Sequence, residues 1–447
     1  MTRKEPGFSK GIDWSIVWLY LLLVAIGIMA IYAVTSEDES LATGFFSFKT
    51  DYSKQFYYFI IAGFLGIFIL LTDSKFFTAT ANLWYAVGIF MMLLVFPFHS
   101  RIKGTESIIR FGGFQFQPAE FCKVCVCLAL AKYLSLPDQD FSKSRSQLIA
   151  AAIALIPAVM SIAQHETGLA LVYFAFFIVM YREGLPATIL IIGFSVAALV
   201  VATLLVEKNI LAIILTGLAS LVVFILWRQI KRDRSLLIGI VLLWAVCVGI
   251  QRFGVPFLFQ HVFQPYQVER IFSTIGKDVP EDYIKPQDRI KLALEGKKNN
   301  KDVDYNVKQS KIAIGSGGLV GKGLLKGTQT RNKFVPEQRT DFIFCTIGES
   351  FGFVGTTIVL AIYLILLFRI VAIAERQRSV FSRCYAYGVA SVFFFHIVIN
   401  ICMTVGLAPV IGIPLPFISY GGTSLLTFTI LLFILIRLDA DRQMVLR

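Results

Sequence analysis

The chain has 447 residues, of which 56% are hydrophobic and 16% charged, and 41 of them are phenylalanine. This composition excludes an ordinary soluble domain and places most of the chain in a lipid bilayer. The net charge of +13 is spread over many connections and forms no basic helix with interleaved aromatic residues. We therefore expect no nucleic-acid partner, and we expect membrane lipids with anionic headgroups beside the basic rims.

Apolar runs of roughly 17 to 25 residues predict twelve membrane-spanning helices. They lie at 12–34, 55–72, 76–97, 117–134, 147–163, 168–182, 186–206, 210–227, 236–258, 342–368, 384–406 and 417–436. The predicted fold class is all-α, a polytopic membrane bundle of about 10–12 transmembrane helices with one large extracytoplasmic loop. The first run is too long for the apolar part of a cleavable signal, so we expect it to remain as the first helix.

Lysine and arginine predict the orientation of the bundle, because short cytoplasmic connections are enriched in positive charge. With the N-terminus inside, the basic stretches at 228–234 and 369–383 both fall on the cytoplasmic side. The chain then divides into N-terminal transmembrane helices at 1–258, an extracytoplasmic loop at 259–341 and C-terminal transmembrane helices at 342–447. All three belong to one integral membrane domain.

Glu120 and Lys123 lie within the expected span at 117–134. Ionisable side chains inside a bilayer are functional candidates by default. A spacing of three residues puts both on one helix face, where they can pair or line a polar cavity. A purely structural ion pair is the alternative. Three nearby cysteines, Cys122, Cys125 and Cys127, have no histidine or second cysteine pair beside them, so we interpret them as apolar fillers.

Glu166 lies between two apolar runs near the outer surface, where it is either a helix cap or a ligand. The extracytoplasmic loop that follows further along is richer in glycine than a spacer requires. Its polar and glycine residues include Gln309, Ser310, Lys311, Gly315, Gly317, Gly318, Gly321, Lys322, Gly323, Gly327, Thr328, Gln329, Glu337 and Asp341. Glycines beside basic side chains allow close approach of the backbone to a phosphate. We therefore interpret the loop as the working surface of the protein.

The last span begins irregularly, with two prolines and a glycine pair between 414 and 424. Such backbone lines a cavity in many membrane proteins, since its unpaired groups can meet a polar ligand there. A simple turn is the alternative.

Together these motifs resemble the shape, elongation, division and sporulation (SEDS) family. The resemblance rests on 309–318, Gly321, Gly323, 327–329, 335–344 and 414–424, and it covers nearly the whole chain. It is closest to the rod-shape branch, with the division branch as the alternative. The chain departs from the family at Ala119, which replaces a serine, at Glu166, which replaces an aspartate, and at Ser350, which replaces a glutamate. The family typically has ten spans, so twelve imply an extra hairpin, which we place within 186–258.

The resemblance implies a peptidoglycan glycosyltransferase that polymerises lipid II during cell-wall elongation and cell-shape maintenance. A loop aspartate would act as general base, with undecaprenyl pyrophosphate as the leaving group. The position that matches this aspartate is Asn299, and an asparagine cannot accept a proton as a base. We therefore expect the catalytic residue to be Asp302, or else Asp304. Asp278 and Asp282 remain alternatives, because the loop contains two copies of one short motif.

Further site residues follow from the motifs and the resemblance. The expected substrate-binding residues are Glu120, Lys123, Gln309, Ser310, Lys311, Gly317, Gly318, Lys322, Thr328, Gln329 and Ser419. The expected residues that brace the loop are Glu166, Glu337, Asp341, Pro416, Gly421 and Gly422. A divalent cation, Mg²⁺ or Mn²⁺, would be able to assist, although no dense carboxylate cluster demands one.

The expected partners are lipid II, a class B penicillin-binding transpeptidase and other membrane proteins of the elongation complex. The expected location is the cytoplasmic (inner) membrane, with the active site on the extracytoplasmic face. Two functions from other classes compete with the polymerase: a transporter (flippase) for lipid-linked precursors, and a non-catalytic scaffold for a synthesis complex.

Overall fold

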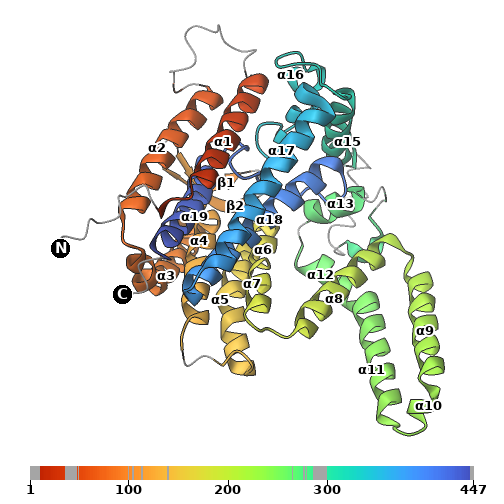
Figure 1. Ribbon diagram of the computed structural model, residues 1–447. Coiled ribbons are helices and arrows are strands. Elements are labelled where there is room, and N and C mark those ends of the chain that lie inside the picture. Colours follow the sequence, from red (N-terminus) through yellow and green to blue (C-terminus); the bar gives the residue numbers. More distant parts are fainter. Residues whose placement is uncertain are drawn as a thin grey trace. The chain divides into compact units, whose positions relative to one another are not determined.

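The computed structural model describes residues 11–35, 48, 50–98, 100–102, 105–111, 114–137, 140–263, 265–274, 277, 279–284 and 300–442. Within these ranges ten helices are long and apolar enough to cross a membrane. The chain forms two compact units, one from Met1–Leu185 with Asn306–Arg447 and one from Pro186–Tyr305 (Figure 1).

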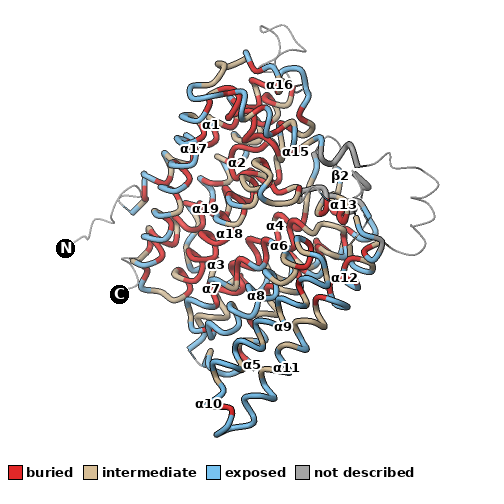
Figure 2. The backbone as a smooth tube through the Cα atoms, turned by 90° about the vertical axis from the view of Figure 1, so that its right-hand side faces the viewer, coloured by how far each residue is buried: buried red, intermediate tan, exposed pale blue. Residues whose placement is uncertain are grey.

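In its described residues the first unit consists of helices and one small sheet. Its helices are α1 (Trp14–Thr35), α2 (Asp51–Leu71), α3 (Ser74–Phe98), α4 (Pro118–Leu134), α5 (Ser144–Ala163), α6 (Thr167–Tyr173), α7 (Phe176–Arg182), the part of α15 (Asn300–Ser316) from residue 306 onward, α16 (Thr328–Arg331), α17 (Ile343–Arg376), α18 (Val380–Val405) and α19 (Gly422–Ala440). Helix α4 contacts α3, α5, α18 and α19 and is buried along most of its length (Figure 2). The most apolar windows of α18 and α19 are 61% and 72% buried, against 22% for α2 and α3, so α4, α18 and α19 form the centre of this unit.

The sheet consists of β1 (Ser100–Ile102), β2 (Thr105–Phe111) and β3 (Phe114–Phe116), paired antiparallel in that order. The sequence did not predict it, because three short strands carry little periodic signal. The Thr423 hydroxyl at the start of α19 donates to the Gln115 carbonyl at 2.7 Å, which holds β3 against the last helix.

A charged network joins the residue before α1 to the C-terminal parts of α17 and α19. The carboxylate of Asp13 lies 2.8 Å from Arg369 and 2.9 Å from Arg376, and Arg376 also pairs with the buried Asp439. Burial alone would raise the pKa of Asp13, but hydrogen bonds and positive charge from the two arginines outweigh it and lower that pKa below its usual value. The network therefore ties together helix ends that are far apart in the sequence.

The second unit contains α8 (Ala187–Leu205), α9 (Lys208–Ile225), α10 (Trp227–Ile230), α11 (Ser235–Gly249), η2 (Ile250–Gly254), α12 (Val255–His261), α13 (Pro265–Thr274) and η3 (Glu281–Tyr283). Helices α9 and α11 run side by side, joined by α10 (Figure 1). A small aromatic core of Phe259, Phe272 and Tyr283 packs where α12, α13 and η3 meet. Lys208 pairs with Asp282 at 2.6 Å and lies over the Tyr283 ring at 4.8 Å, so η3 is fixed to the start of α9.

Each of the twelve predicted runs contains a helix, so the polytopic helical fold is confirmed. Ten of these runs hold the long helices, α4 has 17 residues, and the apolar stretch Thr167–Arg182 is shorter still. The predicted loop at 259–341 is partly helical, since it includes α13, α15 and α16. The extra hairpin within 186–258, where α8, α9 and α11 lie, stays a prediction.

Candidate functional site

Lys123 and Glu120 form a buried ion pair in the first two turns of α4. The Lys123 ammonium lies 2.7 Å from Oε2 of Glu120, and neither side chain is more than 2% exposed. Pro118 at the start of α4 fixes the first turn, because its ring supplies a helical φ and the missing N–H would be unpaired there anyway. The spacing of three residues therefore brings the two charges together on one face.

The same ammonium contacts two residues that the sequence analysis did not select. His396 of α18 places Nε2 2.7 Å from Lys123 Nζ, and the Phe428 ring of α19 lies 5.2 Å from it. His396 directs its other nitrogen, Nδ1, to the Pro414 carbonyl at 3.1 Å. The signal was present in the sequence as a lone histidine inside an apolar span, a residue type that is costly there unless it has partners.

The irregular segment at 414–421 lies between α18 and α19 and is buried in protein. Its freed carbonyls accept from helix side chains: Tyr363 donates to Pro416 at 2.5 Å, and Gln55 donates to Ser419 at 3.4 Å. The Gly421 amide donates to the side-chain Oε1 of Gln55 at 3.2 Å, and Gly422 lies against the ring of Tyr58. Non-helical backbone at membrane depth needs partners of this kind.

The Ser419 hydroxyl connects this segment to the end of the extramembrane loop. It accepts from the Leu415 amide at 2.8 Å and donates to the Thr340 carbonyl at 2.6 Å. Asn400 of α18 donates to the carbonyls of Asp341 and Ile413, at 2.8 Å and 2.7 Å. The loop end and the irregular segment are therefore held together by two buried polar side chains.

The glycine-rich part of the loop is joined to a break in α17. Gly352 has φ +65° and ψ −159°, which interrupts the helix and frees backbone groups on both sides. The amides of Phe353 and Val354 donate to the Gly318 and Leu319 carbonyls at 2.9 Å and 3.0 Å. In return the amides of Lys322 and Gly323 donate, each at 3.0 Å, to the carbonyls of Glu349 and Ser350.

This exchange explains why two of the loop glycines are required. A Cβ at Gly317 would lie 2.0 Å from the Gly348 carbonyl oxygen, and one at Gly321 would lie 2.2 Å from that of Ser350. Gly321 also has φ +83°, a conformation that other residues rarely adopt. The structure thus gives these glycines a packing role against α17, whereas their predicted role at a phosphate stays a prediction.

Glu349 is the centre of the same region and was not selected from the sequence. Its fully buried carboxylate lies 2.9 Å from the Lys322 ammonium. It accepts from the backbone amides of Thr328, Gln329 and Thr330 at 2.8, 2.9 and 2.8 Å, and from the Thr330 hydroxyl at 2.8 Å. A carboxylate that fills this ring of amides occupies the donors that a phosphate would use. Lys322, Thr328 and Gln329, all predicted to bind substrate, therefore converge on Glu349.

The other predicted binding residues of the loop lie on α15. The Ser310 hydroxyl is buried and donates to the Thr404 carbonyl at 2.9 Å. Lys311 is exposed, and its side chain runs so close to Gly406 that a Cβ there would lie 2.2 Å from Lys311 Cε. Gln309 is half-buried, and Gly318 is exposed with φ +56°.

Of the predicted bracing residues, Glu166 and Asp341 connect segments that are distant in the sequence, and Glu337 makes a local contact. Glu166 precedes α6 and accepts from the Ser107 hydroxyl of β2 at 2.6 Å and from Gln117 at 3.2 Å. Glu337 accepts from the Thr340 hydroxyl at 3.2 Å. Asp341 contributes its carbonyl to Asn400, as described above.

The candidate catalytic carboxylates are not tested by the geometry. Asp302 and Asp304 lie in the first turns of α15, but their side chains fall outside the described part of the chain, as do Asp278 and Asn299. Asp282 is described and is paired with Lys208. Among the residues that the structure describes, no group of three or more His, Cys, Asp or Glu side chains is placed to hold a metal ion.

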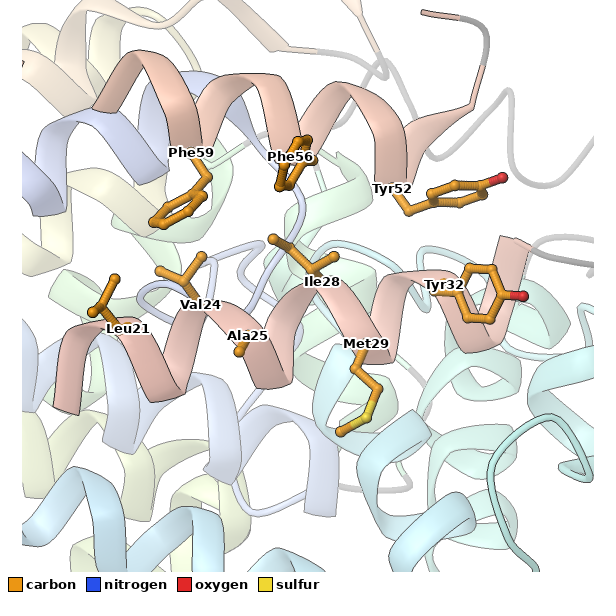
Figure 3. Close-up of a pocket in the computed structure, with 9 residues that line it drawn as sticks. All are labelled: Leu21, Val24, Ala25, Ile28, Met29, Tyr32, Tyr52, Phe56 and Phe59. Atoms are coloured by element: carbon orange, nitrogen blue, oxygen red, sulfur yellow. The ribbon is translucent and has the colours of Figure 1, made fainter. Parts of the chain in front are cut away.

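An apolar groove of about 490 Å³ lies between α1 and α2. Nine side chains line it: Leu21, Val24, Ala25, Ile28, Met29, Tyr32, Tyr52, Phe56 and Phe59 (Figure 3). None of them carries a charge, and none was predicted to bind substrate. Both helices are candidate membrane spans, so the chemistry of the groove suits a hydrocarbon chain.

Comparison with known proteins places this architecture among characterised relatives. The profile of the FtsW/RodA/SpoVE family, described as cell cycle protein, matches residues 13–444. The peptidoglycan glycosyltransferase RodA of Treponema pallidum is 30% identical over 96% of this chain and 97% of its own length. The crystal structure of the rod shape determining protein RodA of Thermus thermophilus is similar with a TM-score of 0.59 at 21% identity, over 98% of this chain and 99% of that one.

A third similar chain comes from a structure that describes the coordination of polymerization and crosslinking by a peptidoglycan synthase complex. It has a TM-score of 0.64 at 21% identity, over 96% of this chain and 98% of the other. At this identity the two solved structures support the fold.

Proposed function

This chain belongs to the FtsW/RodA/SpoVE family, and from that premise we propose that it is a peptidoglycan glycosyltransferase that polymerises lipid II into glycan strands during cell-wall elongation. The observation that carries the proposal is the match, over nearly the full length of both chains, to a relative named for this activity. That relative also supports the rod-shape branch rather than the division branch.

The proposed reaction needs a base, and α15 offers two candidates for it. Asp302 or Asp304 would take the proton from the 4-hydroxyl of the acceptor sugar. The resulting oxygen would form a bond to the anomeric carbon of the donor as the bond to undecaprenyl pyrophosphate breaks, with inversion. General-base assistance contributes about 100- to 10,000-fold to the rate of such a step.

The leaving pyrophosphate must be stabilised by positive charge, and the candidate lysines differ in how exposed their side chains are. Lys311 is exposed, and the Lys322 side chain is 27% exposed. Lys322 directs two of its three N–H groups to Thr328 and Glu349, which leaves one for a ligand. We therefore assign the pyrophosphate to Lys311 and Lys322. The Lys123 side chain is 0% exposed and paired with Glu120, so it does not contact the pyrophosphate directly. Among the described residues no cluster of carboxylates is placed to hold Mg²⁺ or Mn²⁺, and assistance by either cation stays a prediction.

The remaining parts of the proposal concern location and partner. The protein is a multi-pass membrane protein, and we place it in the inner membrane with the loop on the extracytoplasmic face, where lipid II is polymerised. A polymerase of this kind makes strands without cross-linking them. The fold shared with a chain of a polymerizing and crosslinking complex supports a class B penicillin-binding transpeptidase as partner.

The test is polymerisation of purified lipid II by purified protein, alone and with such a transpeptidase. Wild-type protein should give glycan chains, and Asp302→Ala or Asp304→Ala should abolish them. Asp140→Ala, in the connection between α4 and α5, is the matched control and should stay active. Activity in both loop variants would remove the catalytic assignment. Translocation of lipid II across vesicles without any polymer would instead favour a transporter, and the absence of both activities would favour a scaffold.

A further inference from the structure

The contacts of His396 determine its protonation state. As an ammonium paired with the Glu120 carboxylate at 2.7 Å, Lys123 has only donors to offer, so the His396 nitrogen 2.7 Å from it, Nε2, must present a lone pair. The Pro414 carbonyl can only accept, so the nitrogen 3.1 Å from it, Nδ1, must carry the proton. His396 is therefore neutral, with its proton on Nδ1, while Lys123 is charged and is balanced by Glu120.

Burial of these side chains disfavours a second positive charge on His396. His396 and Lys123 are both 0% exposed and Glu120 is 1% exposed, so water cannot compensate a second positive charge. The edge-on contact between the His396 and Phe428 rings, with centroids 4.8 Å apart and planes at 90°, holds the imidazole in place. Lys123 thus selects one tautomer of a ring that cannot turn freely.

The hydrogen bond to Pro414 leads directly to the loop. Pro414 begins the irregular segment whose Ser419 hydroxyl holds the Thr340 carbonyl, and Asn400, one helical turn beyond His396 on α18, holds the Asp341 carbonyl. Two neighbouring polar residues of α18 therefore fix the irregular segment and the end of the loop. The buried charge pair on α4 is connected to both through one imidazole.

We propose that His396 is a positioning residue: held by Lys123 in its Nδ1-protonated form, it fixes the Pro414 carbonyl and so aligns the irregular segment and the adjoining end of the extramembrane loop for the reaction. Lys123 then acts on the site through His396 rather than by touching substrate. The part that concerns catalysis rests on the proposed glycosyltransferase function, whereas the tautomer and the segment it holds do not.

The tautomer is tested by nitrogen NMR of protein labelled at its 4 histidines, reconstituted in lipid. The signal that disappears in His396→Asn belongs to His396. We expect a neutral ring with the proton on Nδ1, unchanged between about pH 5 and 9 because Lys123 excludes a second charge. A proton on Nε2, or a doubly protonated ring in that interval, would overturn the proposal.

The positioning role is tested with three variants that distinguish the contributions of the two ring nitrogens of His396. His396→Asn keeps a donor near the place of Nδ1, His396→Gln keeps an acceptor near the place of Nε2, and His396→Leu keeps neither. Hydrogen exchange at 415–421 should rise about tenfold in the Leu and Gln variants and remain near wild type in the Asn variant. Phe394→Leu, an exposed change on the same helix, is the matched control. Equal exchange in all three variants would reject the positioning role.

The kinetics of lipid II polymerisation add a measurement that distinguishes positioning from a loss of stability. We expect kcat to fall about tenfold in His396→Leu with KM nearly unchanged, and to recover in His396→Asn. Failure of the wild-type protein to polymerise would reject the proposed function, while the NMR and exchange results would still judge the tautomer and the segment it holds. An active wild type with an equally active His396→Leu would reject the positioning role alone.

Discussion

Replacing Glu349 by glutamine should release the glycine-rich part of the loop from α17. The change removes the charge that Lys322 pairs with and puts an amide group where an acceptor stood, so at least one buried donor among Thr328, Gln329 and Thr330 loses its partner. Breaking a buried ion pair from one side costs about 3–5 kcal/mol. Lys322 is partly exposed, so we take the lower figure of about 3 kcal/mol, which corresponds to roughly 150-fold in the population of the open loop.

Limited proteolysis of the reconstituted protein measures that population. Trypsin should cleave after Lys326, Arg331 and Lys333 on the order of 100-fold faster in Glu349→Gln than in wild type, while the helices stay resistant. The control is Glu375→Gln, which removes a half-exposed partner of Arg182 and should change cleavage by less than about fivefold. If cleavage in Glu349→Gln rises less than threefold, the carboxylate does not hold the loop and the account of this region is wrong.

Three further predictions concern backbone strain, acid stability and a buried hydroxyl. Gly321→Ala should lower the yield of folded protein sharply because its Cβ has no space, whereas Gly323→Ala, with φ +97° but no contact nearer than 3.6 Å, should cost only about 1 kcal/mol in a thermal-unfolding comparison. Asp13 has a lowered pKa, so its stabilising contribution should be present above about pH 4 and disappear as the pH falls through its folded-state pKa; an acid-unfolding profile that Asp13→Asn leaves unshifted would contradict this. Tyr363→Phe should cost about 1–2 kcal/mol in the same thermal assay, because the Pro416 carbonyl loses its buried donor.

Hydrophobic runs in the sequence were sufficient to predict the long helices. A span of this length must satisfy its backbone internally and face lipid, so composition alone predicts it, and all twelve predicted runs contain helices. The pairing of Glu120 with Lys123 was also accessible, because a spacing of three residues on one helix is a local property. The family motifs then pointed to the correct family.

The partners of those charges could not be predicted from the sequence. His396 lies 273 positions from Lys123, and nothing in either neighbourhood specifies the other. In the sequence, Glu349 looks like an ordinary helix residue. Its surroundings follow from the break in the helix at Gly352, where residues 318–323 pack against α17. Two of the glycines from which a phosphate site was predicted, Gly317 and Gly321, make room for the backbone of α17. Local sequence cannot distinguish these two uses of a missing Cβ, and the phosphate site stays a prediction.

The sequence by itself determined which segments form apolar helices, where the polar loop lies between them and which family the chain resembles, because these depend on composition and on contacts within a few residues. Only the tertiary structure decided what the buried charges and the loop glycines contact. Those contacts join helices and loops far apart in the chain, and their geometry follows from how α4, α17, α18 and α19 pack.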